Sequence, residues 1–247
     1  MSMRFSVIIP VLHEAAGIND LLDHLRRLKG AGHCEIIVVD GSADQETLLP
    51  IAASDVICLS SPPGRARQMN AGAALASGDV LIFLHADTRL PTDALLLIGR
   101  AITGSAHWGG AFNLGISSGK WIYRLIAWIA SLRSRLTRIP YGDQGIFIRR
   151  AAFRNLGGFP VIPIMEDVAL MRQIKKRGGK ITIIPRPVAT SSRRWESEGV
   201  LCTTLRNWLL LAAYMLGRPP EKLARYYKNA NHDPNRRQED YGGERKK

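Results

Sequence analysis

Runs of consecutive apolar residues alternate with amphipathic segments through the first part of the chain. Short apolar runs rich in β-branched residues are typical of strands buried on both faces, as in a parallel sheet covered by helices. The sequence predicts such strands at 5–10, 34–40, 56–59 and 80–84. Apolar residues at helical spacing predict helices over 15–28 and 65–76, and the turn at 41–44 is expected to lead into a third. This order predicts a parallel, right-handed α/β sheet.

The second half of the chain is less regular. A strand at 108–114 contains Gly109-Gly110, which predicts close approach of a ligand or of another backbone segment. A basic helix with tryptophans on its apolar side is expected over 120–138, and Arg193 to Trp195 are expected in a polar loop. The remaining predicted elements are strands at 146–148 and 180–184 and helices at 168–176 and 203–216.

The net charge of +13 over 247 residues favours an anionic partner, such as a nucleotide, a nucleic acid or an acidic lipid surface. The three cysteines show no CxxC spacing, which fits a reduced cytoplasmic setting. The N-terminus lacks the long apolar region of a signal peptide, and no apolar stretch is long enough to span a bilayer. We therefore expect a cytoplasmic protein that does not cross a membrane unaided.

Carboxylates stand at the ends of two predicted parallel strands. Asp40 and Asp87 would both emerge at the carboxyl edge of the sheet, where open α/β sheets bind ligands. Asp87 could hold a divalent cation that in turn binds a diphosphate, or it could merely end a turn. Arg65, Arg67 or Arg193 could contact the phosphates.

A second acidic pair, Glu166-Asp167, begins a predicted helix in the second half of the chain. One of these carboxylates could act as the general base for a hydroxyl nucleophile. The alternative interpretation is ordinary acidity at a helix N-terminus, which the helix dipole favours.

The ordered set of motifs resembles the family 2 glycosyltransferases over roughly residues 4 to 195, and the C-terminal helices resemble a bacterial subgroup of that family. The motifs are Val7-Ile8-Ile9-Pro10 with Glu14, Ile37 to Ser42, Asn70-Ala71-Gly72, His85-Ala86-Asp87, Gly157-Gly158-Phe159, Glu166-Asp167 and Arg193-Arg194-Trp195. The resemblance implies a GT-A type fold, with a Rossmann-like, mostly parallel sheet flanked by helices and a C-terminal helical extension. It also implies an inverting, hexosyltransferase-type enzyme. Such an enzyme moves a sugar from a nucleoside diphosphate sugar to a hydroxyl acceptor, with Mg²⁺ or Mn²⁺ assisting departure of the diphosphate.

The resemblance also implies roles for single residues. Asp87 would be the metal-binding end of a DxD motif whose first position is His85, and His85 would supplement metal or ribose binding; an imidazole suits Mn²⁺ better than Mg²⁺. Asp167 or Glu166 would be the catalytic base. The nucleotide-sugar-binding residues would be Pro10, Glu14, Asp40, Arg65, Arg67, Asn70, His85, Ala86, Arg193, Arg194 and Trp195.

On this basis we expect one catalytic domain over residues 1–230 and a disordered tail over 231–247. The domain would comprise a nucleotide-sugar-binding half (4–115), an acceptor half (116–200) and C-terminal helices (201–230).

One enzyme alternative and one binding alternative stay open. A sugar-phosphate nucleotidyltransferase would share the sheet and the metal carboxylate, but the Gly-rich signature with Arg and Lys after the first strand is missing. A non-catalytic nucleotide-sugar or anionic-surface binder would also suit the charge. No nucleic-acid-binding motif is found, and we expect no nucleic-acid partner.

The acceptor is not defined by the sequence. The helices expected over 120–138 and 203–216 could touch the inner face of a membrane, which would suit a lipid-linked acceptor, while a soluble acceptor is equally allowed. Either helix could instead pack on the domain, and both could form a homodimer interface.

Overall fold

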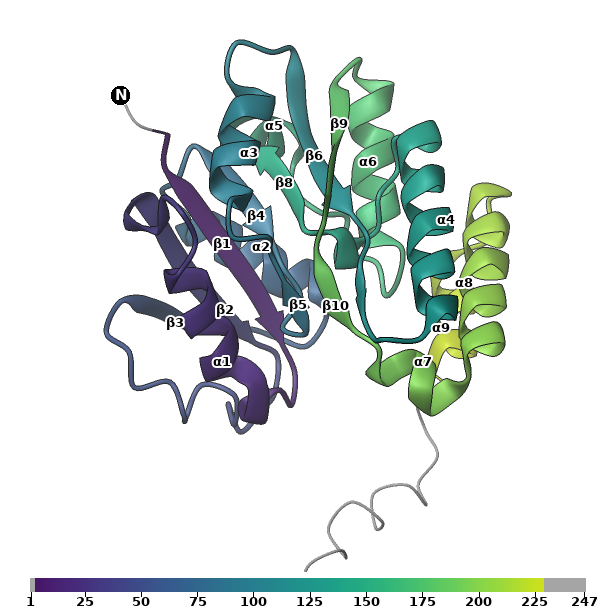
Figure 1. Ribbon diagram of the computed structural model, residues 1–247, viewed down its shortest axis with the longest axis horizontal. Helices are drawn as coiled ribbons and strands as arrows, with labels where there is room; N and C mark the ends of the chain where they lie inside the picture. The colour runs from purple at the N-terminus through teal and green to yellow at the C-terminus, as the bar shows by residue number, and fades with distance from the viewer. Residues whose placement is uncertain (1–2, 229–247) are drawn as a thin grey trace, which may run out of the picture. The chain divides into compact units, whose positions relative to one another are not determined.

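The computed structural model describes residues 3–228, which form two compact units (Figure 1). The first unit contains the described residues up to Val161 together with Glu166–Arg193, and the second contains Ile162–Met165 and the described residues from Arg194 onward. The predicted tail at 231–247 lies outside the described residues. The predicted domain boundaries at 115, 200 and 230 stay a prediction.

The first unit is built on a seven-stranded sheet with the order β3-β2-β1-β4-β8-β6-β9. Four of its neighbouring strand pairs are parallel, and β8 is antiparallel to both of its neighbours. The predicted mostly parallel α/β fold is confirmed. The strands are β1 (Phe5–Val11), β2 (Cys34–Asp40), β3 (Val56–Ser60), β4 (Val80–Phe83), β6 (His107–Asn113), β8 (Ile146–Arg149) and β9 (Lys180–Pro187).

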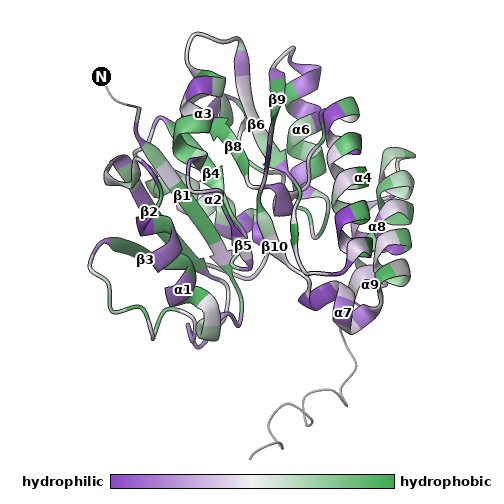
Figure 2. Ribbon diagram, viewed as in Figure 1, coloured by the Kyte–Doolittle hydropathy of each residue, from purple (hydrophilic) through white to green (hydrophobic). Residues whose placement is uncertain are grey.

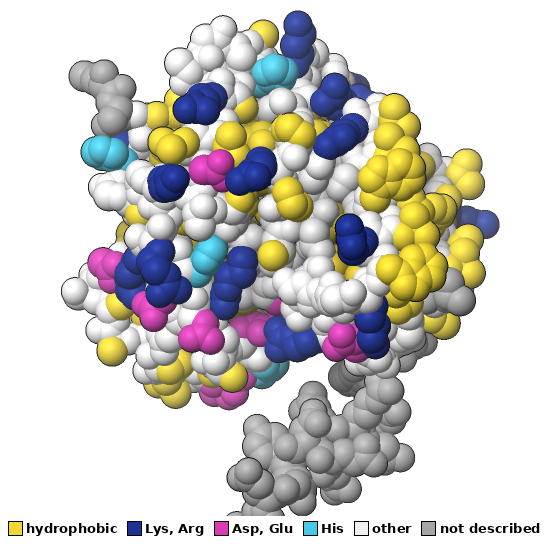
Figure 3. Space-filling view, in the orientation of Figure 1, with side chains coloured by type: hydrophobic (Ala, Val, Ile, Leu, Met, Phe, Trp, Pro, Cys, Tyr) yellow, Lys and Arg dark blue, Asp and Glu magenta, His cyan; other side chains and the backbone are white. Residues whose placement is uncertain are grey.

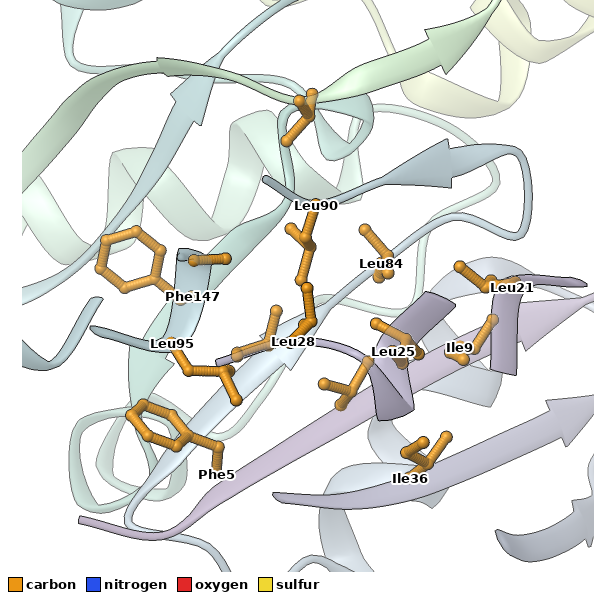
Figure 4. Packing of buried hydrophobic residues seen from close by; sticks show 14 of the residues in the cluster. Phe5, Ile9, Leu21, Leu25, Leu28, Ile36, Leu84, Leu90, Leu95 and Phe147 are labelled. Carbon is orange, nitrogen blue, oxygen red and sulfur yellow. The ribbon is translucent and has the colours of Figure 1, made fainter. Parts of the chain in front are cut away.

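Helices cover both faces of the first strands of the sheet, as the double-sided apolar pattern predicts. Alternate side chains of β1 point to opposite faces of the sheet. Ile9 packs in the cluster that includes Leu21 and Leu25 of α1 (Figure 4). Ile8 instead faces Gly72 of α2. Both faces of β1 are therefore buried, and Figure 2 shows this strand as strongly hydrophobic. The helices of the first unit are α1 (Ala15–Arg26), α2 (Arg65–Leu75), α3 (Ala94–Ile102), α4 (Trp121–Thr137), α5 (Arg150–Leu156) and α6 (Glu166–Lys176), with short 3-10 turns at η1 (Ala31–His33) and η2 (Gly142–Gln144).

A second, three-stranded sheet connects the end of β4 to the region before α4. Its order is β5-β10-β7, formed by β5 (Thr88–Arg89), β10 (Ala189–Ser191) and β7 (Ile116–Ser117). Because β5 follows directly after Asp87, this small sheet extends outward from the carboxyl edge of the main sheet.

The second unit is helical. It contains α8 (Val200–Met215), α9 (Pro220–Lys228) and most of α7 (Arg193–Glu198), and a small apolar cluster of Ile164, Leu210, Leu223 and Ala224 holds it together. Within the described part of the chain, no helix has both the length and the apolarity needed to cross a bilayer.

Two sequence-based expectations are wrong. No helix follows the turn at 41–44: residues 41–55 form turns, because the Asp40 carboxylate accepts backbone N–H groups of this segment and so fixes a compact loop. Arg193 to Trp195 lie in α7 and not in a loop. Arg194 and Glu198, at the i,i+4 spacing of a helix, form an ion pair there.

The Gly109-Gly110 pair of β6 is explained by backbone proximity. A Cβ on Gly109 would lie 2.3 Å from the carbonyl oxygen of Phe147, and one on Gly110 would lie 2.2 Å from that of Thr182. The predicted close approach is thus made by the neighbouring strands β8 and β9.

The substitution Gly109→Ala should therefore destabilise the fold, because backbone atoms must move to admit the methyl group. We expect the free energy of unfolding to fall by about 2–3 kcal/mol in urea titrations followed by circular dichroism. The matched control is Gly119→Ala, where no atom lies within 4 Å of the added Cβ. Its unfolding free energy should change by less than about 1 kcal/mol. Equal effects of the two substitutions would contradict the packing argument.

Candidate functional site

The antiparallel direction of β8 places a distant loop over the end of β4. Ile146, the first residue of β8, pairs with Phe83, the last residue of β4. The segment 141–145, which precedes β8, therefore lies at the carboxyl edge of β4, beside the His85-Ala86-Asp87 motif. The sequence alone shows no sign of this proximity.

Gly142 brings the two main predicted motifs together. Its N–H donates to Oδ2 of Asp167 at 2.7 Å, and a Cβ at this position would lie 2.7 Å from Nε2 of His85 and 3.6 Å from that same Asp167 oxygen. His85 and Asp167 thus flank one glycine, and a side chain at this position would force the His85 imidazole to shift.

Asp87 is anchored through its backbone and remains half-buried. Its carbonyl oxygen accepts the N–H of Ser191 at 3.0 Å, and its Oδ1 accepts the hydroxyl of Thr88 at 3.2 Å. The Thr88 and Thr190 hydroxyls are hydrogen-bonded at 3.0 Å beneath this turn. The small sheet therefore fixes the backbone from which the Asp87 carboxylate projects.

Among the described residues, no group of three or more His, Cys, Asp or Glu side chains could hold a metal ion by itself. His85 and Asp87 supply only an imidazole and a carboxylate. This small donor set fits a cation that takes its remaining ligands from water and from a bound diphosphate, as Mg²⁺ commonly does with one or two carboxylates.

Asp40 shapes the loop that follows β2. Its side chain is fully buried; Oδ1 accepts the N–H and the hydroxyl of Ser42, and Oδ2 accepts the N–H of Thr47. The hydroxyl of Thr47 in turn accepts the N–H of Glu14 at 3.1 Å. These hydrogen bonds hold the loops after β1 and β2 together at the carboxyl edge of the main sheet.

Gln68, near the start of α2, joins the ends of the same two strands. Its buried side-chain amide donates to the carbonyl oxygens of Val11 and Val39, at 2.7 and 2.9 Å. The only sequence signal was a polar residue on the sheet-facing side of α2.

The other predicted donor-side residues surround this edge. Glu14 forms an ion pair with Arg193 (Nη2 to Oε2, 3.3 Å), which joins the first loop to the start of α7. Pro10 is buried in β1, Ala86 is half-buried, and Arg67 is exposed near the start of α2.

Asn70 contacts the Gly157-Gly158-Phe159 motif, 89 residues further along the chain. Its side-chain amide donates to the carbonyl of Phe159 at 2.8 Å, and its Oδ1 accepts the N–H of the same residue at 2.9 Å. Gly157 and Gly158 have φ values of 84° and 82°, a conformation that favours glycine. These two hydrogen bonds join α2 to the segment after α5, and we call them the Asn70–Phe159 latch.

Glu166 is buried beside an arginine. Its Oε1 lies 3.0 Å from Nε of Arg65, and its side chain is 3% exposed. Burial raises the pKa of Glu166, and the Arg65 guanidinium opposes that shift without cancelling it. Glu166 therefore orients Arg65 at the start of α2.

Asp167 differs from Glu166 in its environment. Oδ1 accepts the N–H of Val168 and Oδ2 accepts the N–H of Gly142, both at 2.7 Å. Both oxygens of Asp167 are therefore engaged by backbone N–H groups, whereas Glu166 faces the Arg65 guanidinium.

The loop that carries Gly142 is held by α4 through residues that the sequence did not single out. The Arg133 guanidinium stacks 3.4 Å above the centre of the Tyr141 ring, and burial raises the pKa of Tyr141 to about 12. The side chain of Gln144 accepts the Ser134 hydroxyl at 2.6 Å and donates to the carbonyl of Phe112 at 2.9 Å. The sequence shows only a polar glutamine in the segment Tyr141 to Gly145, and its burial is revealed by the structure.

Arg194 and Trp195 belong to the second unit. Arg194 lies over the Tyr227 ring at 4.4 Å, and Trp195 is buried. Their roles in binding nucleotide sugar stay a prediction, as do those of the other predicted site residues.

Comparison with known proteins identifies relatives of the chain. The model for "Glycosyl transferase family 2" matches residues 6–153. A "PGL/p-HBAD biosynthesis glycosyltransferase" from Mycobacterium bovis is 35% identical over 181 residues, which are 63% of this chain and 62% of that protein. A glucosyl-3-phosphoglycerate synthase from Mycobacterium tuberculosis is 25% identical and covers 68% of this chain and 54% of its own length. The chain thus spans about three fifths of the length of the first of these relatives.

Solved structures show the same fold. A mannosyltransferase from Pyrobaculum calidifontis in complex with GDP-Man and Mn²⁺ has a TM-score of 0.62 at 18% identity, over 96% of this chain and 83% of that one. The glucosyl-3-phosphoglycerate synthase from M. tuberculosis with Mn²⁺, UDP and glucosyl-3-phosphoglycerate has a TM-score of 0.61 at 22% identity, over 88% and 81%. At these identities the likeness establishes the GT-A type fold alone.

The buried Glu166 should make stability depend on pH. Because its pKa is raised in the folded state, the folded protein binds more protons than the unfolded chain above the ordinary value of 4.5. The free energy of unfolding should then fall as pH rises from about 4.5 through the raised pKa. Urea titrations at a series of pH values should show this fall in the parent protein and a smaller one in Glu166→Gln. Parallel pH profiles for the two proteins would contradict the assignment.

Proposed function

The chain belongs to glycosyl transferase family 2, and from this premise we propose that it transfers a sugar from a nucleoside diphosphate sugar to a hydroxyl acceptor with inversion. The observation that carries the proposal is the meeting of His85 and Asp167 at Gly142, at the carboxyl edge that also holds Asp87. This proximity supports the proposal that Asp87 binds the donor and that Asp167 accepts the proton.

We assign the donor side to the loops after β1, β2 and β4. Asp87, with His85, would hold Mg²⁺ or Mn²⁺, and when bound the cation would neutralise negative charge on the diphosphate. Arg65, oriented by Glu166, lies in the first turn of α2, where backbone N–H groups and the helix dipole also favour an anion. The bond between Glu14 and Arg193 borders the same region.

Asp167 acts as the base in the proposed reaction. It takes the proton of the acceptor hydroxyl as the hydroxyl oxygen forms a bond to the anomeric carbon. The bond from that carbon to the diphosphate breaks, and the diphosphate leaves with the electron pair. A single displacement of this kind inverts the configuration at the anomeric carbon.

The acceptor side is proposed from helix α4. This helix exposes large apolar side chains next to cations, and Figure 3 shows them as a yellow surface over α4 with dark blue residues beside it. We propose that this face contacts an anionic membrane surface from the cytoplasmic side.

Donor binding should depend on Asp87 and on a divalent cation. With Mn²⁺ and one class among UDP-, GDP- and dTDP-sugars at about 100 times the dissociation constant, we expect stabilisation by about 2.7 kcal/mol, a rise in Tm of roughly 5–10 °C. Addition of a chelator, or the substitution Asp87→Ala, should abolish most of this rise in a thermal-shift assay.

The matched control for this experiment is Asp55→Ala. Asp55 precedes β3 at the opposite edge of the sheet and pairs with Arg26 on the surface. This variant should keep the full ligand-induced shift. If none of the nucleotide sugars stabilises the parent protein, the proposed donor site is wrong.

Catalysis should separate Asp167 from Glu166. We expect Asp167→Asn to lower kcat by about 10² to 10⁴-fold with little change in donor affinity, because it removes the base and keeps the shape. Glu166→Gln should instead raise KM for the donor, because Arg65 loses its charged partner, and should lower kcat by less than about tenfold.

The readout is release of nucleoside diphosphate from the donor that gives the thermal shift, with water or a screened alcohol as acceptor. A larger loss of kcat in Glu166→Gln than in Asp167→Asn would assign the base to Glu166.

A further inference from the structure

A hollow of about 330 Å³ lies beside α4 in the first unit, and none of the predicted site residues lines it. Its walls are one stripe of α4, the segment 113–116 that follows β6, and Pro187 at the end of β9. The volume lies near the lower end of the range of about 300 to 1,000 Å³ found for small-molecule pockets.

The inside of the hollow is mainly apolar, because the hydroxyl of Ser131 that lines it already forms hydrogen bonds with the backbone. The Ser131 hydroxyl donates to the carbonyl of Ala127 at 2.7 Å and accepts the N–H of Leu114 at 3.0 Å. Ala127 and Leu114 are buried, and the short side chain of Ala127 leaves the space open. Trp128, with 62% of its surface exposed, lines the opening. A hydrocarbon chain would bury this surface.

Cations stand at both ends of the stripe. Arg124 and Arg135 line the hollow about 16 Å apart along the helix axis, and none of the described residues that line it is Asp or Glu. Nε of Arg135 donates to Oδ1 of Asn113 at 3.1 Å, which orients the guanidinium at the rim. A guanidinium favours phosphate, sulfate or carboxylate oxygens. The charge of the rim therefore selects an anionic group.

The hollow is connected to the catalytic edge through the small sheet. Ile116, which lines it, pairs in β7 with Thr190 of β10, and the next residue, Ser191, donates its N–H to the carbonyl of Asp87. The hollow therefore belongs to the same framework as the proposed metal-binding turn, but it uses a separate set of side chains.

We propose that this hollow binds a single-chain anionic amphiphile. The apolar chain lies against Ala127 and Trp128, and the anionic group lies at Arg124 or Arg135. Binding requires neither the donor nor a metal ion, so the site is independent of the proposed glycosyl transfer. It also differs from contact with a flat membrane, which would engage every exposed apolar residue of α4 and not only those at the hollow.

The test is calorimetric titration with decyl phosphate below its micelle concentration, at constant ionic strength. We expect one molecule bound per chain. Trp128→Ala should weaken binding by about tenfold or more, and the double substitution Arg124→Gln with Arg135→Gln by about tenfold. The matched control is Trp121→Ala, because Trp121 lies on the same helix, is 71% exposed and does not line the hollow. The affinity of the Trp121→Ala variant for decyl phosphate should equal that of the parent protein.

Control ligands and control variants distinguish binding in the hollow from binding of the phosphate group alone, of the alkyl chain alone, or of the whole helix face. Inorganic phosphate and uncharged decyl maltoside should each bind at least about tenfold more weakly than decyl phosphate; equal affinity for either would overturn the proposal. Equal losses in Trp121→Ala and Trp128→Ala would indicate adsorption on the helix face and would also overturn it. Vesicles of phosphatidylglycerol and phosphatidylcholine test the membrane proposal separately, since both tryptophan variants should then lose binding. Retention of the nucleotide-sugar thermal shift in all variants shows that the donor side is intact.

Discussion

The pairing of β4 with an antiparallel β8 is the constraint on which the functional edge depends. In a sheet whose other strands near the donor side are parallel, this reversal turns the beginning of β8 toward the end of β4. Gly142 consequently lies between His85 and Asp167. Gly109 and Gly110 allow β8 and β9 to lie close to β6, so the absence of two side chains in one strand helps to position a carboxylate that is distant in sequence.

The two neighbouring acidic residues at the start of α6 have opposite environments. Asp167 accepts two backbone N–H groups, whereas Glu166 is buried and its pKa is raised despite its arginine partner. The cost of burying Glu166 is partly offset by Arg65, which is thereby fixed at the start of α2. The two neighbouring residues therefore have different partners: Asp167 contacts the loop that carries Gly142, and Glu166 contacts the start of α2.

Local pattern predicted the elements well where burial is two-sided. The strand Cys34–Asp40 agrees with the structure at both ends, and the helix expected over 120–138 is found as Trp121–Thr137. The helix expected after residues 41–44 is missing because the Asp40 carboxylate satisfies N–H groups of the loop, an interaction that propensity does not describe. The direction of β8 could not be predicted either, because Ile146 to Ile148 is an apolar run whether the strand is parallel or antiparallel to β4. The approach of Gly142 to His85 depends on that direction, so the sequence did not predict it.

The latch between Asn70 and Phe159 bears on how the protein assembles. The β1–β2 and β2–β3 pairs join strands that are close in sequence, whereas the latch and the β1–β4, β4–β8 and β6–β9 pairings all close long loops. The entropy of closing such loops must be offset before these contacts become favourable, so they are slow to form. Local opening should therefore begin at the edge that carries Gly142, while the first strands remain paired. The chain thus keeps its first three strands paired and completes the edge that carries Gly142 only when the whole first unit has closed.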